Sequence, residues 1–301
     1  MSDFVQQQNS ICDFNSSDSW VILSPIEQSI KRKIEAVGTP LKDWDIQINY
    51  GIKTGFNDAF IISTEKRNEI LANCKTEDER QRTAELIRPI LRGRDIKRYG
   101  YVDNGLYLIN THNGVRGRIP RIKIEDYPAI KAHLDQYWDR IATRADKGDT
   151  PYNLRNCAYL EDFNKPKVVY MEIQTDNPEE GYPFPCYSYD DKRCVVLNTA
   201  YIMSSETLDP RYVLGILNSR VGKFLVKLYV TQLQERQFRM LSQYVMKFPI
   251  ARPTREQKKE MTRLVQDVLV NKSIASENRI DELAFQIYKL SEQEIKLLTS
   301  R

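Results

Sequence analysis

The sequence predicts an α+β fold, in which a mixed-sheet body is followed by a helical segment at the C-terminal end. The chain has 301 residues, 41% of them hydrophobic, so it can bury a sizeable core in one large or two modest domains. Up to residue 252, short apolar or alternating runs that are typical of strands are interspersed with apolar residues at helical spacing. Beyond residue 252 only the helical spacing recurs, which indicates that the last segment is helical.

Composition divides the chain into three regions. Residues 1–19 are rich in Ser, Asn, Asp and Gln, as expected of a flexible N-terminal tail. Residues 20–252 form the predicted α+β body, which ends at the proline of Ala251-Arg252-Pro253. Residues 253–301 form the helical C-terminal segment.

The first expected helix begins after Ser24, which is followed by Pro25 in the first turn and by Glu27 in a capping box. Apolar residues at helical spacing continue this helix to Val37, and Gly38 is a suitable stop. Further along, the pattern predicts a strand over 45–50, a turn over 51–58, a strand over 59–62, two short helices within 64–88, a strand over 105–110 and a helix over 127–146.

The second half of the body repeats this mixture. Strands are expected over 167–173, 194–197, 201–204 and 244–250, with a proline-rich loop over 176–185. The clearest helix starts at Asp209-Pro210 and has one wide apolar face. Capping boxes at Thr254-x-x-Gln257 and Ser291-x-x-Glu294 open the first and the last helices of the C-terminal segment.

The formal net charge of +4 hides an uneven distribution. Residues 88–123 hold nine basic and two acidic residues, and residues 211–252 hold eight basic and one acidic residue, so each block carries +7 and the rest of the chain −10. Two basic blocks in an acidic remainder favour a polyanion-binding surface on which both blocks converge. Solvated surface with acidic neighbours supplied by the fold explains the blocks equally well.

The sequence contains no recognisable catalytic or metal-binding motif. The five cysteines form no Cys-x-x-Cys pair, and with two histidines they give no zinc pattern. The stretch GILNSRVGKF over 215–224 has the wrong spacing for a phosphate-binding loop, and Phe224 stands where Ser or Thr is required. No apolar run approaches the ~20 residues that cross a bilayer, and no secretory leader is present. We therefore expect a cytoplasmic protein with no catalytic residue, no metal and no membrane partner.

One carboxylate pattern leaves a nuclease open as an alternative. Glu179 precedes Asp190-Asp191-Lys192 by about ten residues, an arrangement by which many nucleases hold Mg²⁺ and orient a water. Magnesium sites of this kind are built on paired strands, whereas these residues fall in a predicted loop and turn. A solvated turn is therefore the better account of the pattern.

Two segments carry residues suited to nucleic-acid recognition. The turn Gly51–Asp58 presents Lys53, Thr54 and Asn57, and such a turn can aim backbone N–H groups and a lysine at a phosphate. An ordinary hairpin turn also explains its two glycines. Residues 231–239 are dense in Gln and Arg, which pair with adenine and guanine edges, although a polar helix end has the same composition.

These segments, in this order, resemble the TaqI-like C-terminal specificity domain, the DNA target-recognition part of type IIG restriction–modification enzymes and related adenine-N6 methyltransferases. The resemblance covers nearly the whole chain from Trp20 and is specific in combination rather than in any single motif. Its motifs are WVILSP (20–25), TPLKDW (39–44), GIKTGFNDAFII (51–62), IRPILRGRDIKRY (87–99), KPKVVYMEI (165–173), LGILNSRVGKF (214–224), FPIARPTREQ (248–257) and the ending 280–295.

The resemblance implies a domain that binds double-stranded DNA, reads a short sequence and delivers an adenine to a methyltransferase. The expected phosphate-binding residues are Lys53, Thr54, Asn57, Arg94, Lys97 and Arg98, and the expected base-reading residues are Arg116, Arg118, Arg121, Gln234 and Arg236. No cofactor is expected in this chain. S-adenosylmethionine and Mg²⁺ belong to the catalytic domains of such enzymes, which are expected to be partners.

Relatives of this family carry a methyltransferase domain, and often a nuclease domain, ahead of the region seen here. We therefore expect the chain to be a fragment, an expressed piece of a longer protein, or a free-standing specificity subunit that borrows its catalysis. The apolar stripes of residues 254–301 suggest packing on such a partner or formation of a homo-oligomer. A free-standing Mg²⁺ nuclease and a protein–protein scaffold that uses these helices are the alternatives.

Overall fold

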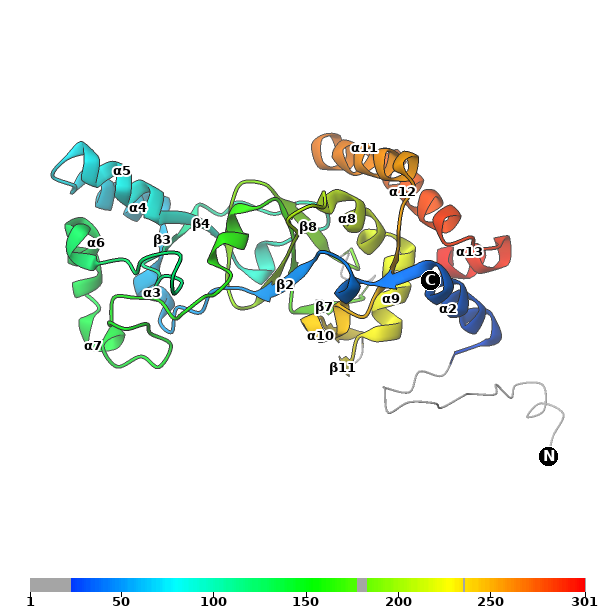
Figure 1. Ribbon diagram of the computed structural model, residues 1–301, viewed down its shortest axis with the longest axis horizontal. Coiled ribbons are helices and arrows are strands. Elements are labelled where there is room, and N and C mark those ends of the chain that lie inside the picture. The colour runs from blue at the N-terminus through cyan, green and yellow to red at the C-terminus, as the bar shows by residue number, and fades with distance from the viewer. Residues whose placement is uncertain (1–22, 178–182, 235, 301) are drawn as a thin grey trace, which may run out of the picture. The chain divides into compact units, whose positions relative to one another are not determined.

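A computed structural model describes residues 23–177, 183–234 and 236–300 and confirms the α+β class (Figure 1). The predicted tail, residues 1–19, lies outside the described residues. The described chain divides into two compact units. Unit 1 comprises residues 23–46, 173–177, 183–186 and 207–300, and unit 2 comprises residues 47–172 and 187–206. The predicted boundary at residue 252 therefore falls inside unit 1.

Unit 2 is built on two four-stranded sheets. The first is antiparallel and has the order β2-β10-β6-β8, with bounds Gln47–Tyr50, Ala200–Ser204, Lys167–Met171 and Tyr187–Asp190. The second has the order β3-β5-β4-β9, with bounds Ile61–Ser63, Leu106–Ile109, Ile87–Leu91 and Val195–Val196. In this sheet β4 and β9 run parallel and the other pairs antiparallel.

The helices of unit 2 are short, and in the sequence most of them directly precede or follow strands of the second sheet. They are α3 (Asn57–Phe60), α4 (Thr64–Ala72), α5 (Glu77–Leu86), α6 (Pro128–Asp135) and α7 (Trp138–Ile141), with 3-10 turns at Gly93–Asp95, Ile124–Asp126 and Leu160–Asn164. One hydrophobic core joins these helices to both sheets, and Phe60, Leu108, Ile130 and Val169 are fully buried in it. The apolar runs that predicted strands are thus the runs that fill the core.

Two local predictions in unit 2 are wrong, and so is the alternative of an ordinary hairpin turn at 51–58. Residues 57–60, part of which was expected in a strand, form the helical turn α3, and the strand starts only at Ile61. The strands before and after the 51–58 turn do not pair with each other, because β2 pairs with β10 and β3 with β5. The turn is therefore not a hairpin turn. The helix expected over 127–146 is divided into α6 and α7 at Gln136-Tyr137.

Unit 1 is mainly helical. Its helices are α2 (Pro25–Val37), α8 (Pro210–Asn218), α9 (Arg220–Tyr229), α10 (Ser242–Val245), α11 (Arg255–Asn271), α12 (Ile274–Ile287) and α13 (Glu292–Thr299), with one 3-10 turn at Leu41–Asp43. Strand β1 (Gly38–Pro40) pairs with β13 (Pro249–Ala251), and β11 (Gln232–Gln234), β12 (Gln237–Arg239) and β7 (Ile173–Thr175) form a three-stranded antiparallel sheet. The capping boxes predicted at Ser24, Thr254 and Ser291 are all confirmed.

The C-terminal helices form part of the core of unit 1. Gly215 of α8 approaches α11 so closely that a Cβ there would lie 2.4 Å from Sδ of Met261. The Tyr288 hydroxyl donates to the Pro249 carbonyl and accepts from the Ala251 amide, both at 3.0 Å, which joins the end of α12 to β13. These contacts join residues on the two sides of the predicted boundary at residue 252, which stays a prediction.

The apolar stripes that suggested an oligomer are buried within unit 1. Leu264 and Val268 of α11 and Ile280 and Leu283 of α12 are each exposed by 2% or less. Burial against the unit's own helices leaves these side chains unavailable to a second chain. The predicted homo-oligomer through the C-terminal helices therefore loses the observation on which it rested.

Candidate nucleic-acid interface

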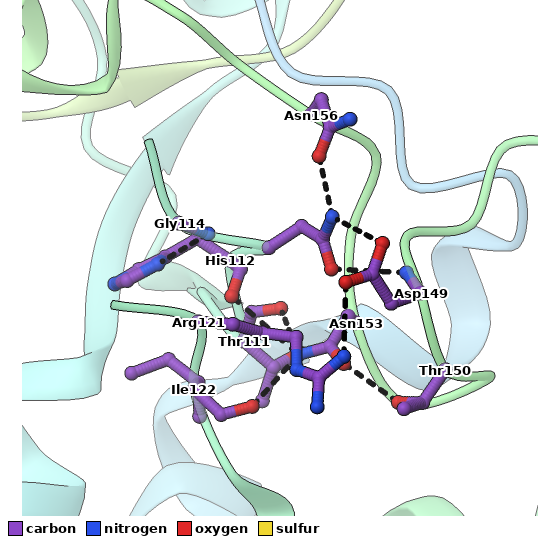
Figure 2. A network of polar contacts seen from close by, with 10 residues as sticks. Thr111, His112, Gly114, Arg121, Ile122, Asp149, Thr150, Asn153 and Asn156 are labelled. Carbon is purple, nitrogen blue, oxygen red and sulfur yellow. Dashed lines mark hydrogen bonds and ion pairs between the residues drawn. The ribbon is translucent and has the colours of Figure 1, made fainter. Parts of the chain in front are cut away.

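The loop over residues 110–123, which carries three of the predicted base-reading arginines, is fixed by a polar network to the loop over 147–156 (Figure 2). The Asn113 amide group donates to Oδ1 of Asp149 at 3.0 Å and to Asn156, and its oxygen accepts from the Asp149 amide at 2.9 Å. The Thr111 hydroxyl donates to the Tyr152 carbonyl at 2.7 Å. The two loops therefore form one polar scaffold.

The tip of the 110–123 loop is a tight turn. Val115 and Ile119 pair as an antiparallel bridge with two N–H···O bonds of 2.9 Å. Gly114 and Gly117 have φ angles of +74° and +75°, which are readily adopted only by glycine, so both glycines make the turn possible. Arg116 lies exposed at this tip between the two glycines.

The three arginines of this loop differ in their partners. Arg118 forms an ion pair with Glu161 at 2.9 Å, and Arg121 forms one with Asp149 at 2.9 Å. Both pairs lie largely exposed, so DNA phosphates or bases can exchange with the carboxylates at little cost. Within the described part of the chain, Arg116 is the one of these three arginines that is exposed without an ion-pair partner.

A buried asparagine holds the base of this loop. Asn153 is 1% exposed, and its amide donates to the carbonyl of Ile122 at 2.9 Å and to those of Thr111 and His112 at 3.4 Å (Figure 2). Its side-chain oxygen accepts from the Thr150 hydroxyl at 2.6 Å. One side chain thus satisfies backbone groups at both ends of the loop.

Arg144 connects this scaffold to the predicted phosphate-binding turn. Its guanidinium donates to the carbonyls of Asp146, Pro151 and Asn153 at 2.6–3.0 Å, and also to the Thr54 carbonyl. The guanidinium carbon lies 4.3 Å from the ring centroid of Phe60. Burial lowers the pKa of Arg144 to about 10, so the group is still charged at neutral pH.

The turn over residues 51–58 presents its predicted phosphate ligands unequally. Lys53 and Asn57 are exposed, whereas Thr54 is 2% exposed and donates its hydroxyl to Oδ1 of Asn57 at 2.6 Å. Gly55 adopts a φ of +70° beside Asp146. The prediction for Thr54 is corrected on this point, because a buried, engaged hydroxyl fixes the turn and does not reach the surface.

The segment after β4 contains one cation that fixes the backbone and others that are exposed to solvent. Arg92 forms a bidentate pair with the buried carboxylate of Asp95 at 2.8 and 2.9 Å, which fixes the 3-10 turn at Gly93–Asp95. Arg94 and Lys97 are exposed, and Lys97 donates to the Arg94 carbonyl at 3.0 Å. Arg98 is half-buried over the ring of Tyr99.

Residues 231–239 form a β-hairpin instead of a helix end. Strands β11 and β12 pair with each other, and β12 pairs with β7. Gln234 and Arg236 are both exposed, and Arg236 has a φ of +62° in the turn between the strands. The alternative of a polar helix end is therefore wrong. The hairpin places these two side chains at the β11–β12 turn, at one end of the three-stranded sheet that β7 completes.

The two basic blocks belong to different units, 88–123 to unit 2 and 211–252 to unit 1. Their convergence on one surface therefore stays a prediction. What the structure brings together is the turn at 51–58 and the loop at 110–123, both held by Arg144 and Asn153. Neither Arg144 nor Asn153 was predicted from the sequence. Their partners are backbone carbonyls, which leave no residue pattern to find.

Of the carboxylates on which the nuclease alternative depends, Asp190 is engaged in a buried ion pair. Glu179 lies outside the described residues. Asp190 is fully buried, with Oδ2 at 2.5 Å from Nζ of Lys167 and at 3.0 Å from the Cys194 amide, and with Oδ1 at 3.0 Å from the Tyr101 hydroxyl. Within the described ranges, no three His, Cys, Asp or Glu side chains are grouped so that they could hold a metal ion.

Comparison with known proteins finds a matching family and similar type II methyltransferases. Residues 88–250, more than half of the chain, match the family described as the TaqI-like C-terminal specificity domain. The type II methyltransferase M.BstVI of Geobacillus stearothermophilus is 23% identical over 95% of this chain and 47% of its own length. The type II methyltransferase M.PaeR7I of Pseudomonas aeruginosa is 21% identical over 93% of this chain and 44% of its own length. The chain thus spans slightly less than half of these relatives.

A solved structure shows a similar fold. The type IIL restriction-modification enzyme MmeI, in complex with DNA, superposes with a TM-score of 0.59 at 13% sequence identity. The match covers 87% of this chain and 37% of that one. As for membranes, none of the described helices combines the length and apolar character that a bilayer span needs.

We predict that Asp190→Asn destabilises the protein by about 3–5 kcal/mol, because it leaves the ammonium of Lys167 buried without a counter-charge. Asp191→Asn, at the exposed neighbouring position, is the control and should change stability by less than about 0.5 kcal/mol. Urea unfolding measures both. Unchanged stability of Asp190→Asn, together with loss of a Mg²⁺-dependent cleavage, would contradict the structural role.

We also predict that Arg144→Met lowers the free energy of unfolding by at least about 2 kcal/mol, because four carbonyl acceptors lose a charged donor. Arg140→Met is the matched control: Arg140 is exposed over the Phe56 ring at 4.8 Å, which is worth only about 0.5–1 kcal/mol. Amide hydrogen exchange over 51–58 and 110–123 should rise in Arg144→Met alone. Equal effects of the two substitutions would show that Arg144 does not hold the loops.

Proposed function

The chain belongs to the TaqI-like C-terminal specificity domain family, and from this membership we propose that it binds duplex DNA and reads a short target sequence. It would serve as the target-recognition part of a restriction–modification adenine methyltransferase or endonuclease. The observation that carries the proposal is the family match over residues 88–250. That range includes the 110–123 loop and the β11–β12 hairpin, which hold all five predicted base-reading residues.

We assign phosphate contacts to the exposed cations of unit 2. Lys53, Arg94 and Lys97 are exposed on segments whose backbones are fixed by Arg144 or by the Arg92–Asp95 pair. Arg98, half-buried, and Asn57, exposed beside Lys53, are further candidates. Such contacts fix the position of a protein on the duplex and carry no sequence information.

We assign base reading to side chains at exposed tips. Arg116 lies at the tip of one loop, and Gln234 and Arg236 lie at the end of a hairpin. Arginine reads guanine and glutamine reads adenine through paired hydrogen bonds in the major groove. Arg118 and Arg121 would join them by exchanging their carboxylate partners for DNA, which the exposure of both ion pairs allows.

Catalysis is assigned to other parts of such an enzyme. The relatives are type II methyltransferases about twice as long as this chain, and the residues described here offer recognition chemistry. In this proposal a methyltransferase or nuclease domain or subunit is the protein partner, and S-adenosylmethionine and Mg²⁺ act there. An adenine delivered to such a site would be extruded from the stack at a cost of a few kcal/mol.

A mobility-shift series across salt concentrations tests DNA binding itself. Each neutralised phosphate contributes about −0.9 to the slope of log K against log salt, so binding should weaken steeply as salt rises. Binding to no duplex at any salt would leave the protein–protein scaffold as the better account. Incorporation of methyl groups into DNA by the chain alone would contradict the assignment of catalysis to a separate domain or subunit.

We predict that Lys97→Ala weakens binding to all duplexes alike and reduces the salt slope by about one unit. Arg236→Ala should instead cost about 1–3 kcal/mol on a duplex with the recognised sequence and little on a scrambled one. Each variant is the control for the other, because each removes one exposed positive charge. If both behaved in the same way on both duplexes, the separation into phosphate and base contacts would be wrong.

A further inference from the structure

A basic groove on unit 1 lies outside every segment assigned above. It has a volume of about 740 Å³ and runs along α11 beside the start of α8. Five of its ten lining residues are basic: Arg211, Arg255, Lys258, Lys259 and Arg263. Of these five residues only Arg211 lies within the family match over residues 88–250 and within a basic block of the sequence. The four cations of α11 lie beyond both, so neither feature indicated the groove.

Helical geometry sorts α11 into a buried and a basic face. Leu264, Val265 and Val268 are each exposed by 2% or less and face the interior of unit 1. Arg255, Lys259 and Arg263 follow one another at four-residue intervals, so a positive charge recurs about every 6 Å along the opposite face. The first turn of the helix adds Lys258.

Acidic neighbours compensate these four cations on α11 only in part: Asp209 and Asp267 interact electrostatically with Lys258 and Arg263 but form no ion pair with them. In the described ranges none of the four cations has a carboxylate within ion-pair distance, whereas Arg211 is held by Asp209 at 2.6 Å. Glu260, on the same helix, pairs with Arg279 at 3.1 Å. The carboxylate in the lining, Asp267, accepts from the Ser276 hydroxyl at 2.5 Å and from the Asn271 amide at 2.7 Å.

Uncompensated like charges at four-residue spacing destabilise a helix by a few tenths of a kcal/mol per pair. Lys259 lies at that spacing from both Arg255 and Arg263, and the acidic residues Glu256, Glu260 and Asp267 of the same helix offset part of this cost. A bound polyanion would remove it. Val270 is the single apolar residue among the ten that line the groove, and the others carry charged or polar end groups.

We propose that this groove binds the sugar-phosphate backbone of duplex DNA and is a second, sequence-independent contact surface of the protein. The inference rests on the proposed DNA-binding function and extends it to the C-terminal helical segment. Each DNA strand carries one phosphate per 3.4 Å of the duplex axis, so a row of cations along about 12 Å of α11 can meet several of them. Such contacts add affinity and salt dependence without adding sequence preference.

The test compares binding of the full chain and its variants to a random-sequence duplex between about 50 and 200 mM salt. Lys259→Ala combined with Arg263→Ala should reduce the salt slope by about two units. The double variant Lys259→Arg with Arg263→Lys keeps both charges and should keep the slope. Lys296→Ala removes an exposed charge from α13 of the same unit and is the matched control, with an unchanged slope.

The outcomes separate this inference from the function on which it rests. If the unaltered chain binds DNA and the double alanine variant, with an unchanged melting temperature, retains the full slope, the groove does not contact DNA. The groove would then fit an acidic protein surface better. If the unaltered chain binds no DNA, both proposals fail. If Lys296→Ala reduced the salt slope as much as the double alanine variant does, the proposed DNA contact at the groove would be wrong. The slope would then depend on exposed positive charge anywhere on the surface.

Discussion

The guanidinium of Arg144 is the interaction on which the recognition surface of unit 2 depends. It is a buried cation whose two terminal nitrogens donate to four backbone carbonyls and whose face lies on Phe60. Arginine suits this position because its planar fork can serve several acceptors at once. One of those carbonyls belongs to Asn153, which in turn holds the loop at 110–123. Two segments that are distant in sequence are thereby fixed to the same support.

A fixed support matters for sequence reading because base contacts require placement of side chains within a fraction of an ångström. Loops tolerate such a role only when their backbones are held by other groups. The tip that presents Arg116 is held by a β-bridge and by the Asn113–Asp149 contacts, and the turn that presents Lys53 is held through Thr54. Exposed side chains on fixed backbones are the arrangement expected of a recognition surface.

The sequence predicted the fold class and the three helix capping boxes, because these follow from local patterns. It located β2, β3, β5, β6, β9 and β10 but missed β4 and β8 of the two main sheets. It failed where partners are distant. The turn at 51–58 is no hairpin because its flanking strands pair elsewhere, and the segment over 231–239 becomes a hairpin through β7. Charge counting likewise treated Arg92 and Arg94 alike, although only Arg92 is committed to a buried aspartate. The roles of Arg144 and Asn153 could not be predicted, since Thr54 lies 90 residues from Arg144 and contributes only a carbonyl.

Selection from a pool of randomised duplexes tests most directly whether this chain alone reads DNA sequence. The pool is incubated with the full chain at moderate salt, bound duplexes are recovered and amplified, and the rounds are repeated. The account predicts convergence on one short sequence, bound at least 10³-fold more tightly than the starting pool, as is typical of specific readers. Recovery of duplexes that still resemble the input, despite clear binding, would contradict it and leave a chain that only holds the DNA backbone.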